Sequence, residues 1–326
     1  MSSSEQTPAV TTAAVKDVQV LLDNDPTEAW PALHRRLNYL LQNDLPAAEF
    51  HSRLAWVESG LEQALGERPD DSLFVLVQML SQSHYGYCAT HALLCAVTCQ
   101  IIAPLAEIGG EERLALTRAA LTQNIGISRL QDSLAHQVQP LSEAQKDTVQ
   151  NHPTTSAAVL RERGVTDPLW LAMVQDHHES PDGKGYPNGK TNLTNTQQLL
   201  RMADLFVALI SPRKSRRGLA PNLAVGNIYI EAQETSSQLG AIFVKQLGMY
   251  PPGTYVRLKS DETALVVRRG PRVNTPLTMA IADEQGMPLS VPSKRDTQYP
   301  GYSIQSPVAP EEVKIRVDTS RLLKRV

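Results

Sequence analysis

The sequence is poor in cysteine and in aromatic residues. Three cysteines among 326 residues cannot build a disulfide framework. Cys88, Cys95 and Cys99 are spaced seven and four residues apart, so they share one face of a helix. We expect them to be small buried residues in a reducing compartment. Aromatic residues make up 5% of the chain and hydrophobic residues 41%, so the core must be mostly aliphatic.

The chain also lacks a strong charge of either sign and any long apolar run. It has 31 basic and 34 acidic residues, a net charge of -3, which argues against a general nucleic-acid-binding protein. No apolar run approaches the ~18 residues that a membrane-spanning helix needs. The first residues do not show the basic-then-apolar order of a secretion signal. We therefore expect a cytoplasmic protein with no DNA partner and no membrane span.

The apolar spacing predicts a mainly α-helical chain with a small β-rich end, and the length suggests two or three domains. We divide the chain into a flexible tail (1–15), an N-terminal helical region (16–70), a helical domain (71–248) and a β-rich C-terminal extension (249–326). Two helices are expected within 72–108, broken near 83–86, and further helices at 111–123, 142–150, 153–163, 167–178, 195–211 and 223–248. Strands are expected at 254–258, 264–268 and 277–281.

Four of the eight histidines stand apart and are expected to be surface residues or satisfied core residues: His34, His51, His84 and His136. The other four are His91, His152, His177 and His178. They are candidates for a metal site together with Asp204, which lies in an apolar helical stretch where a lone carboxylate is costly. Imidazole and carboxylate together suit Mn, Fe or Zn. On spacing alone, helix caps and core hydrogen bonds explain these residues equally well.

The segment after His177 and His178 is unusual for a turn between helices. It reads HHESPDGKGYPNG, and its loop contains Asp182, Gly183, Gly185, Tyr186 and Pro187. Glycine and proline around a tyrosine favour a loop of fixed shape. An ordinary turn requires neither HHE before it nor GYP within it.

This segment resembles the signature of the HD-GYP family, metal-dependent phosphodiesterases that hydrolyse the bacterial second messenger cyclic di-GMP. His91 resembles the early ligand of that family, and His152 lies in a similar His-Pro element. The resemblance covers about residues 72–285. It implies an HD-superfamily helical bundle with a central metal site. The residues implied as metal ligands are His91, His152, His177, His178 and Asp204.

The chain departs from the family pattern at the residues that define it. Gln123 and Asn124 stand where the family has its His-Asp pair, Ile127 replaces a lysine that contacts phosphate, and Tyr87 replaces a glutamate ligand found in part of the family. An uncharged amide bridges two cations poorly, and a two-metal site depends on that bridge. Ordinary two-metal hydrolysis is therefore not expected, and no catalytic residue is assigned.

Two groups of basic residues follow the signature. Arg213 and Arg216 match positions where the family has phosphate contacts, although a solvated basic turn would explain them as well. The run 268–272 in the extension is expected to be solvated.

Three functions remain open from the sequence. The first is a degenerate HD-GYP protein of cyclic di-GMP signalling, which binds the nucleotide, or a protein partner at the GYP loop, without efficient hydrolysis. The second is a residual phosphodiesterase that uses one divalent metal ion (Fe, Mn or Zn) held by His152, His177 and His178. The third is a structural scaffold that binds no metal.

Overall fold

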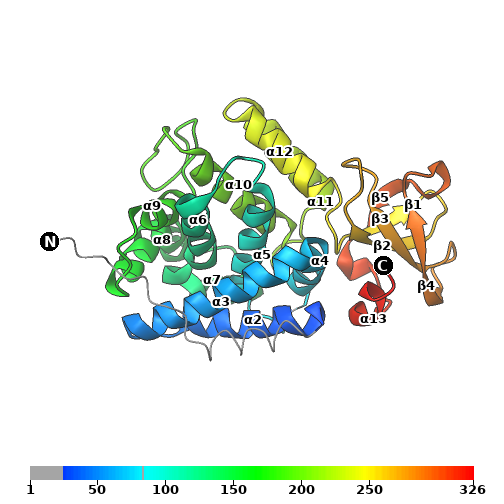
Figure 1. The fold of residues 1–326 in the computed structure, drawn as a ribbon, viewed down its shortest axis with the longest axis horizontal. Coiled ribbons are helices and arrows are strands. Elements are labelled where there is room, and N and C mark those ends of the chain that lie inside the picture. The colour runs from blue at the N-terminus through cyan, green and yellow to red at the C-terminus, as the bar shows by residue number, and fades with distance from the viewer. Residues whose placement is uncertain (1–24, 83) are drawn as a thin grey trace.

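The fold is a helical bundle with a small antiparallel sheet at one end (Figure 1). The computed structural model describes residues 25–82 and 84–326, so the predicted tail and residues 16–24 lie outside the described part. The helices are α2 (Pro26–Gln42), α3 (Ala47–Glu67), α4 (Pro69–Leu80), α5 (Tyr87–Ile102), α6 (Gly110–Thr122), α7 (Ser128–His136), α8 (Glu143–Glu162), α9 (Pro168–Asp176), α10 (Asn195–Ile210), α11 (Pro221–Gln233), α12 (Ser237–Leu247) and α13 (Thr319–Leu323). The mainly α-helical fold class is confirmed.

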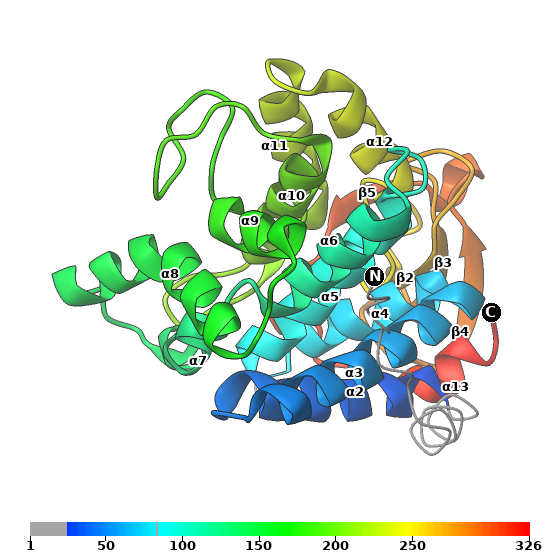
Figure 2. The same ribbon diagram turned by 60° about the vertical axis from the view of Figure 1, so that its left-hand side comes forward.

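Helix α5 forms the centre of the bundle. All its residues except Ile101 are buried, which is typical of a helix that is apolar on every side. It packs against α2, α4, α6, α7, α10 and α12, and Figure 2 shows it enclosed by these helices. Cys88, Cys95 and Cys99 are free and fully buried on α5, as predicted. His34 of α2 is a satisfied core residue, because its Nε2 lies 3.0 Å from the carbonyl of Gly86 just before α5.

The predicted break between 150 and 153 is wrong. Residues 143–162 form the single helix α8, with Pro153 inside it. Proline has no N–H to give to the carbonyl four residues earlier, that of Val149. The Nδ1 of His152 bonds to this carbonyl instead, at 2.5 Å, so the helix continues with the carbonyl paired.

The predicted helix over 223–248 is also wrong, because the chain turns back between α11 and α12. The two helices pack closely, and a Cβ added at Gly240 would lie 2.5 Å from the Cβ of Ala232. A glycine at this crossing therefore allows the fold-back. Helix α7, over residues 128–136, was not predicted.

The extension is a five-stranded antiparallel sheet in the order β4-β3-β2-β1-β5. Its strands are β1 (Tyr255–Leu258), β2 (Thr263–Arg268), β3 (Leu277–Ala282), β4 (Pro288–Asp296) and β5 (Ile304–Pro307). The first three strands match the prediction, whereas β4 and β5 were missed. Strand β4 has no buried residue and contains Pro288 and Pro292, so it carries no clear alternating pattern.

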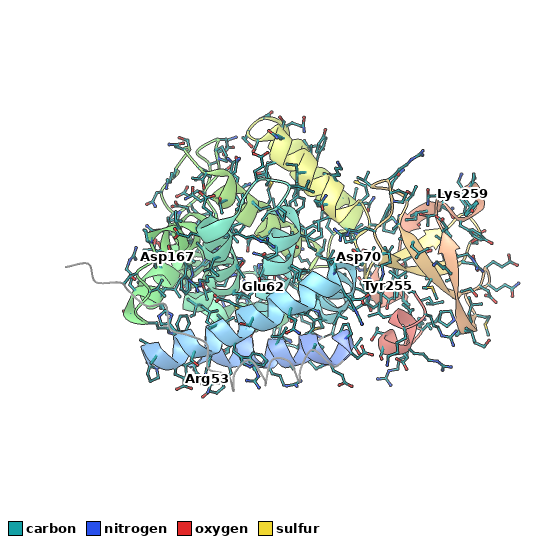
Figure 3. All side chains as sticks on the ribbon, viewed as in Figure 1. Arg53, Glu62, Asp70, Asp167, Tyr255 and Lys259 are labelled. Atoms are coloured by element: carbon teal, nitrogen blue, oxygen red, sulfur yellow. The ribbon has the colours of Figure 1, made fainter. Side chains whose placement is uncertain are left out.

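Strand β2 joins the sheet to the bundle by packing against α4. Arg268 pairs with Asp71 and Arg269 with Asp70, so the expectation that this basic run is solvated is wrong for its first two residues. Figure 3 shows Asp70 and Tyr255 where the two parts meet. The hydroxyl of Tyr255 donates to Gln78 Oε1 at 3.1 Å. None of the helices in residues 25–82 and 84–326 is long and apolar enough to cross a membrane.

Candidate metal centre

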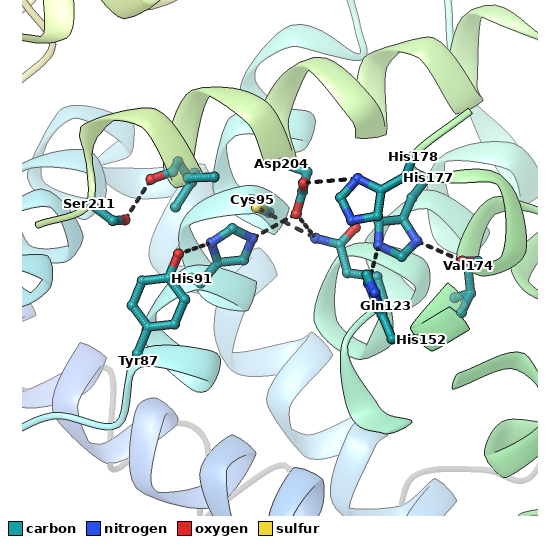
Figure 4. Close-up of polar contacts among 12 residues, drawn as sticks. Tyr87, His91, Cys95, Gln123, His152, Val174, His177, His178, Asp204 and Ser211 are labelled. Atoms are coloured by element: carbon teal, nitrogen blue, oxygen red, sulfur yellow. Dashed lines mark hydrogen bonds and ion pairs between the residues drawn. The ribbon is translucent and has the colours of Figure 1, made fainter. Parts of the chain in front are cut away.

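The five predicted ligands come together in the middle of the bundle (Figure 4). His91 projects from α5, His152 from α8 and Asp204 from α10, while His177 and His178 follow the end of α9. Four of the five residues are buried, and the side chain of His178 is 23% exposed. Their role as metal ligands stays a prediction, whereas their proximity is a feature of the fold.

His152 and His177 are held in the same way by backbone carbonyls. His152 Nδ1 lies 2.5 Å from the carbonyl of Val149, and His177 Nδ1 lies 2.7 Å from that of Val174. Burial lowers the pKa of His152 to about 4 and that of His177 to about 3, so both rings are neutral at pH 7. The single N–H of each ring points to its carbonyl. The two Nε2 atoms face each other at 3.0 Å with lone pairs and no proton between them.

His178 completes a group of three imidazoles. Its ring stacks on Tyr186, with 4.5 Å between ring centroids, and burial lowers its pKa to about 3. One ring nitrogen of His152, one of His177 and one of His178 lie within 4.8 Å of one another. Two nitrogens that each lie about 2.0–2.1 Å from a zinc ion are roughly 3 Å apart, so this group fits one divalent ion. Such an ion would lower the pKa of a bound water and so supply a nucleophile at neutral pH.

Asp204 and His91 form a hydrogen-bonded pair beside this group. His91 Nε2 lies 2.8 Å from Asp204 Oδ1, and the Tyr87 hydroxyl lies 3.3 Å from His91 Nδ1. Burial alone would raise the pKa of Asp204, but the hydrogen bond from His91 and the nearby ring of His178 hold it well below its usual range. The second oxygen of Asp204 lies 3.8 Å from His178 Nδ1. Asp204 therefore lies between His91 and the group of three histidines. Cys95 lies close enough to His91 and Asp204 to form a second group of possible ligands.

Gln123 occupies the position where the sequence resemblance places the family's histidine. Its side chain is fully buried, and its Nε2 donates to Asp204 Oδ1 at 2.9 Å. Its Oε1 has no hydrogen-bond partner among the described residues. The neighbouring Asn124 and Ile127 are also buried. The sequence marked Gln123 as a lost ligand but gave no signal that its amide would bond to Asp204.

The GYP loop is fixed to the end of α9 by a buried carboxylate. Glu179 is fully buried and accepts from the backbone N–H of Asn188 at 2.7 Å and of Lys190 at 2.8 Å. Asp182 accepts from the N–H of Lys184 at 3.0 Å within the loop. The sequence singled out the HHE triplet, but it did not predict that its glutamate binds the loop rather than a metal.

The two predicted phosphate contacts differ in position. Arg213 Nη2 donates to the Tyr87 hydroxyl at 3.0 Å and its guanidinium lies over the Tyr87 ring, so it reaches the edge of the buried site. It lines a cavity of about 230 Å³ together with Tyr87 and Lys214. Arg216 instead donates to the carbonyls of Ala208 and Leu209 near the end of α10. Of the two, Arg213 is the one that contacts a residue of the site.

Comparisons with known proteins identify an HD domain in the chain. The family profile of the HD domain matches residues 75–235. The cyclic di-GMP phosphodiesterase PA4108 of Pseudomonas aeruginosa is 26% identical over 210 residues, which are 62% of this chain and 49% of that protein. The 3'3'-cGAMP-specific phosphodiesterases 3 and 1 of Vibrio cholerae are 30% identical over 135 residues and 26% identical over 163 residues. These matches cover 41% and 49% of this chain, and 29% and 38% of those proteins. The chain thus matches half or less of the length of each relative.

A solved structure has the same fold. Bd1817, a HDG"Y"P protein from Bdellovibrio bacteriovorus, superimposes with a TM-score of 0.55 at 14% identity, over 70% of this chain and 76% of that one. The bundle and its central histidines define an HD-domain protein. With the HHE and GYP elements in place after α9, the HD-domain match and the relatives support membership of the HD-GYP family.

Proposed function

We propose that this chain is a degenerate HD-GYP protein that binds a cyclic dinucleotide without efficient hydrolysis. The observation that carries the proposal is the hydrogen bonding of Asp204. Its Oδ1 accepts from His91 and from Gln123, so protein N–H groups occupy the oxygen that would otherwise be free for a second metal ion. A two-metal centre clamps both the attacking and the leaving oxygen. The hydrogen bonds at Asp204 Oδ1 support a centre with one ion rather than two.

The replaced residues support the same conclusion. The resemblance assigns the bridging role between metals to an aspartate, and Asn124 has no charge with which to fill it. The same resemblance assigns a phosphate contact to a lysine, and the buried Ile127 offers none. Arg213 is a basic group that remains at the edge of the site. We therefore expect phosphate recognition to be retained in part and water activation to be weakened.

The names of the relatives support the ligand class, because two act on 3'3'-cGAMP and one on cyclic di-GMP. A cytoplasmic location and a protein partner at the GYP loop belong to the same proposal. A residual phosphodiesterase with one ion at His152, His177 and His178 is the second candidate. The three inward-facing imidazole nitrogens favour it. A scaffold without ligand is the third.

The test is a turnover and binding experiment on the full chain, reloaded anaerobically with Fe²⁺ or Mn²⁺. Cyclic di-GMP and 3'3'-cGAMP are the probes, with chromatography for products and calorimetry for binding. We expect binding, weakened in Arg213→Met but not in the control Arg217→Ala, and no product above the metal-only blank. The triple variant Gln123→His, Asn124→Asp, Ile127→Lys is expected to gain hydrolysis. Hydrolysis by the unaltered chain that His177→Ala abolishes would establish the residual enzyme instead, and neither binding nor turnover would leave the scaffold.

A further inference from the structure

We infer that Gln123 is itself a metal ligand, through its side-chain oxygen, and that its amide makes the centre mononuclear. The three histidines and Gln123 Oε1 would then hold a single divalent ion. This inference rests on the three-histidine site of the proposed function and adds to it the identity of a fourth ligand and the number of ions.

The orientation of the Gln123 amide is fixed by its neighbour. An ionised carboxylate only accepts hydrogen bonds, so the amide group that faces Asp204 Oδ1 at 2.9 Å must be the NH₂. The oxygen is consequently on the other side of the amide. Figure 4 shows the amide between Asp204 and the histidines, with its nitrogen toward Asp204. The oxygen is buried and meets no donor in the described part of the chain, which is an unfavourable position for a carbonyl group.

No histidine of the site makes a hydrogen bond to that oxygen. His152 and His177 each direct Nδ1 to a backbone carbonyl, and their Nε2 atoms face each other at 3.0 Å. A single proton shared between the two Nε2 atoms would satisfy that pair and still leave Gln123 Oε1 without a donor. The buried centre therefore holds more acceptors than donors. A divalent cation would bind the lone pairs of all these acceptor atoms at once. A carbonyl oxygen beside imidazoles is an acceptable ligand for Mn²⁺, Fe²⁺ or Co²⁺.

The same amide also disfavours metal binding by the second group of possible ligands. His91, Cys95 and Asp204 lie within 4.8 Å of one another. Asp204 Oδ1 is already bonded to His91 and Gln123, and Gln123 Nε2 also lies 3.8 Å from Cys95 Sγ. A second ion bound at Oδ1 would have to displace both N–H donors from this oxygen. The nitrogen of Gln123 thus blocks an ion position at Asp204 Oδ1, while its oxygen completes the site formed by the three histidines.

The experiment measures metal binding rather than turnover. Apo full-length chain is loaded with Co²⁺, and the ion content per chain, the d–d absorption spectrum and the affinity by chelator competition are recorded. We expect one ion per chain. Gln123→Leu, which keeps a similar volume without the oxygen, should bind Co²⁺ about 10-fold or more weakly and with a changed spectrum. The matched control is Gln100→Leu, another buried amide, whose partners are Thr117 and Arg113 away from the centre. It should bind Co²⁺ like the unaltered chain.

A second measurement needs no variant. X-ray absorption of the Co²⁺-loaded chain should show imidazole and oxygen scattering around one ion, and no metal–metal distance of about 3.5–4 Å. An unchanged affinity and spectrum in Gln123→Leu would overturn the ligand role while leaving the three-histidine site in place. Two ions per chain would overturn the mononuclear centre. If the unaltered chain binds no more Co²⁺ than His152→Ala, the metal site of the proposed function fails with this inference.

Discussion

Single residues in the GYP loop show how little freedom its backbone has. A Cβ added at Gly185 would lie 2.3 Å from the backbone nitrogen of Ser180 and 2.5 Å from the Cα of Glu179. Backbone atoms cannot move aside as a flexible side chain can. The absence of a side chain at 185 is therefore needed for the loop to close over the end of α9, where Tyr186 stacks on His178.

We predict that Gly185→Ala lowers the free energy of unfolding by about 1–3 kcal/mol, because the added methyl overpacks the loop. Urea unfolding of the metal-free chain measures it. Gly226 provides the control: it lies inside α11 with nothing within 4 Å of its Cβ position. Gly226→Ala should therefore stabilise the chain by about 0.5–1 kcal/mol. Equal effects at the two positions would contradict the close contact at Gly185.

The sequence predicts the candidate ligands but not all the contacts between their side chains. His91, His152, His177, His178 and Asp204 could be brought together from the sequence because a recognised motif carries them. The contact between Gln123 and Asp204 could not, since 81 residues separate the two and no pattern marks an amide–carboxylate pair. Long-range polar contacts depend on how helices pack, which apolar periodicity alone does not give.

At the scale of elements, α8 uses an internal proline to orient a histidine. Pro153 leaves the carbonyl of Val149 without its helical donor, and His152 Nδ1 takes that place at 2.5 Å. The ring is thereby held with Nε2 toward His177. A proline that lowers helix stability thus fixes the tautomer of a candidate ligand.

We predict opposite effects of Pro153→Ala on stability and on metal affinity. The new N–H at 153 competes with His152 for the carbonyl of Val149, so the helix gains about 1–3 kcal/mol of stability. His152 loses its fixed orientation, and the affinity for Co²⁺ falls about 10-fold. Thermal unfolding and chelator competition measure the two effects. Thr154→Ala, on the exposed face of α8, should change neither by a comparable amount. A Pro153→Ala chain with unchanged affinity would show that the carbonyl does not orient the ring.

Helix α8 also explains one of the two errors in the predicted helix boundaries. Proline is read from sequence as a break, and here the side chain of the preceding residue compensates for it. The turn between α11 and α12 was missed for the opposite reason, because no proline lies within 223–248 and the packing of Gly240 on Ala232 appears only in three dimensions. Helices α6 and α10, by contrast, were predicted within one residue of each end.

At the scale of the whole molecule, one side of the sheet shares the apolar core of the bundle, while Val256, Leu258, Ala264 and Val266 form a separate small cluster. Leu265, Val267, Met279 and Ile281 of the sheet belong to the same cluster of buried residues as the central helices. The boundary of that contact carries the pairs Asp71–Arg268 and Asp70–Arg269, in which the two acidic residues lie in the first turn of α4. Carboxylates at this end also favour the helix dipole.

We predict that Asp71→Asn lowers the free energy of unfolding by about 1–3 kcal/mol while the chain still unfolds in one transition. Asp71 is 4% exposed, so its removal leaves the partly buried Arg268 without its charge partner.

The surface pair Arg217–Glu311 is the matched control, because the Arg217 side chain is 75% exposed, and Arg217→Ala should cost less than about 0.5 kcal/mol. Far-ultraviolet circular dichroism, which the helices dominate, follows the bundle during denaturation, and hydrogen exchange of peptides from residues 255–307 follows the sheet. One shared midpoint, shifted in Asp71→Asn, is expected from the common core. Two midpoints, with the helical one unchanged, would instead mean that the sheet folds independently, and that the charge pairs only attach it.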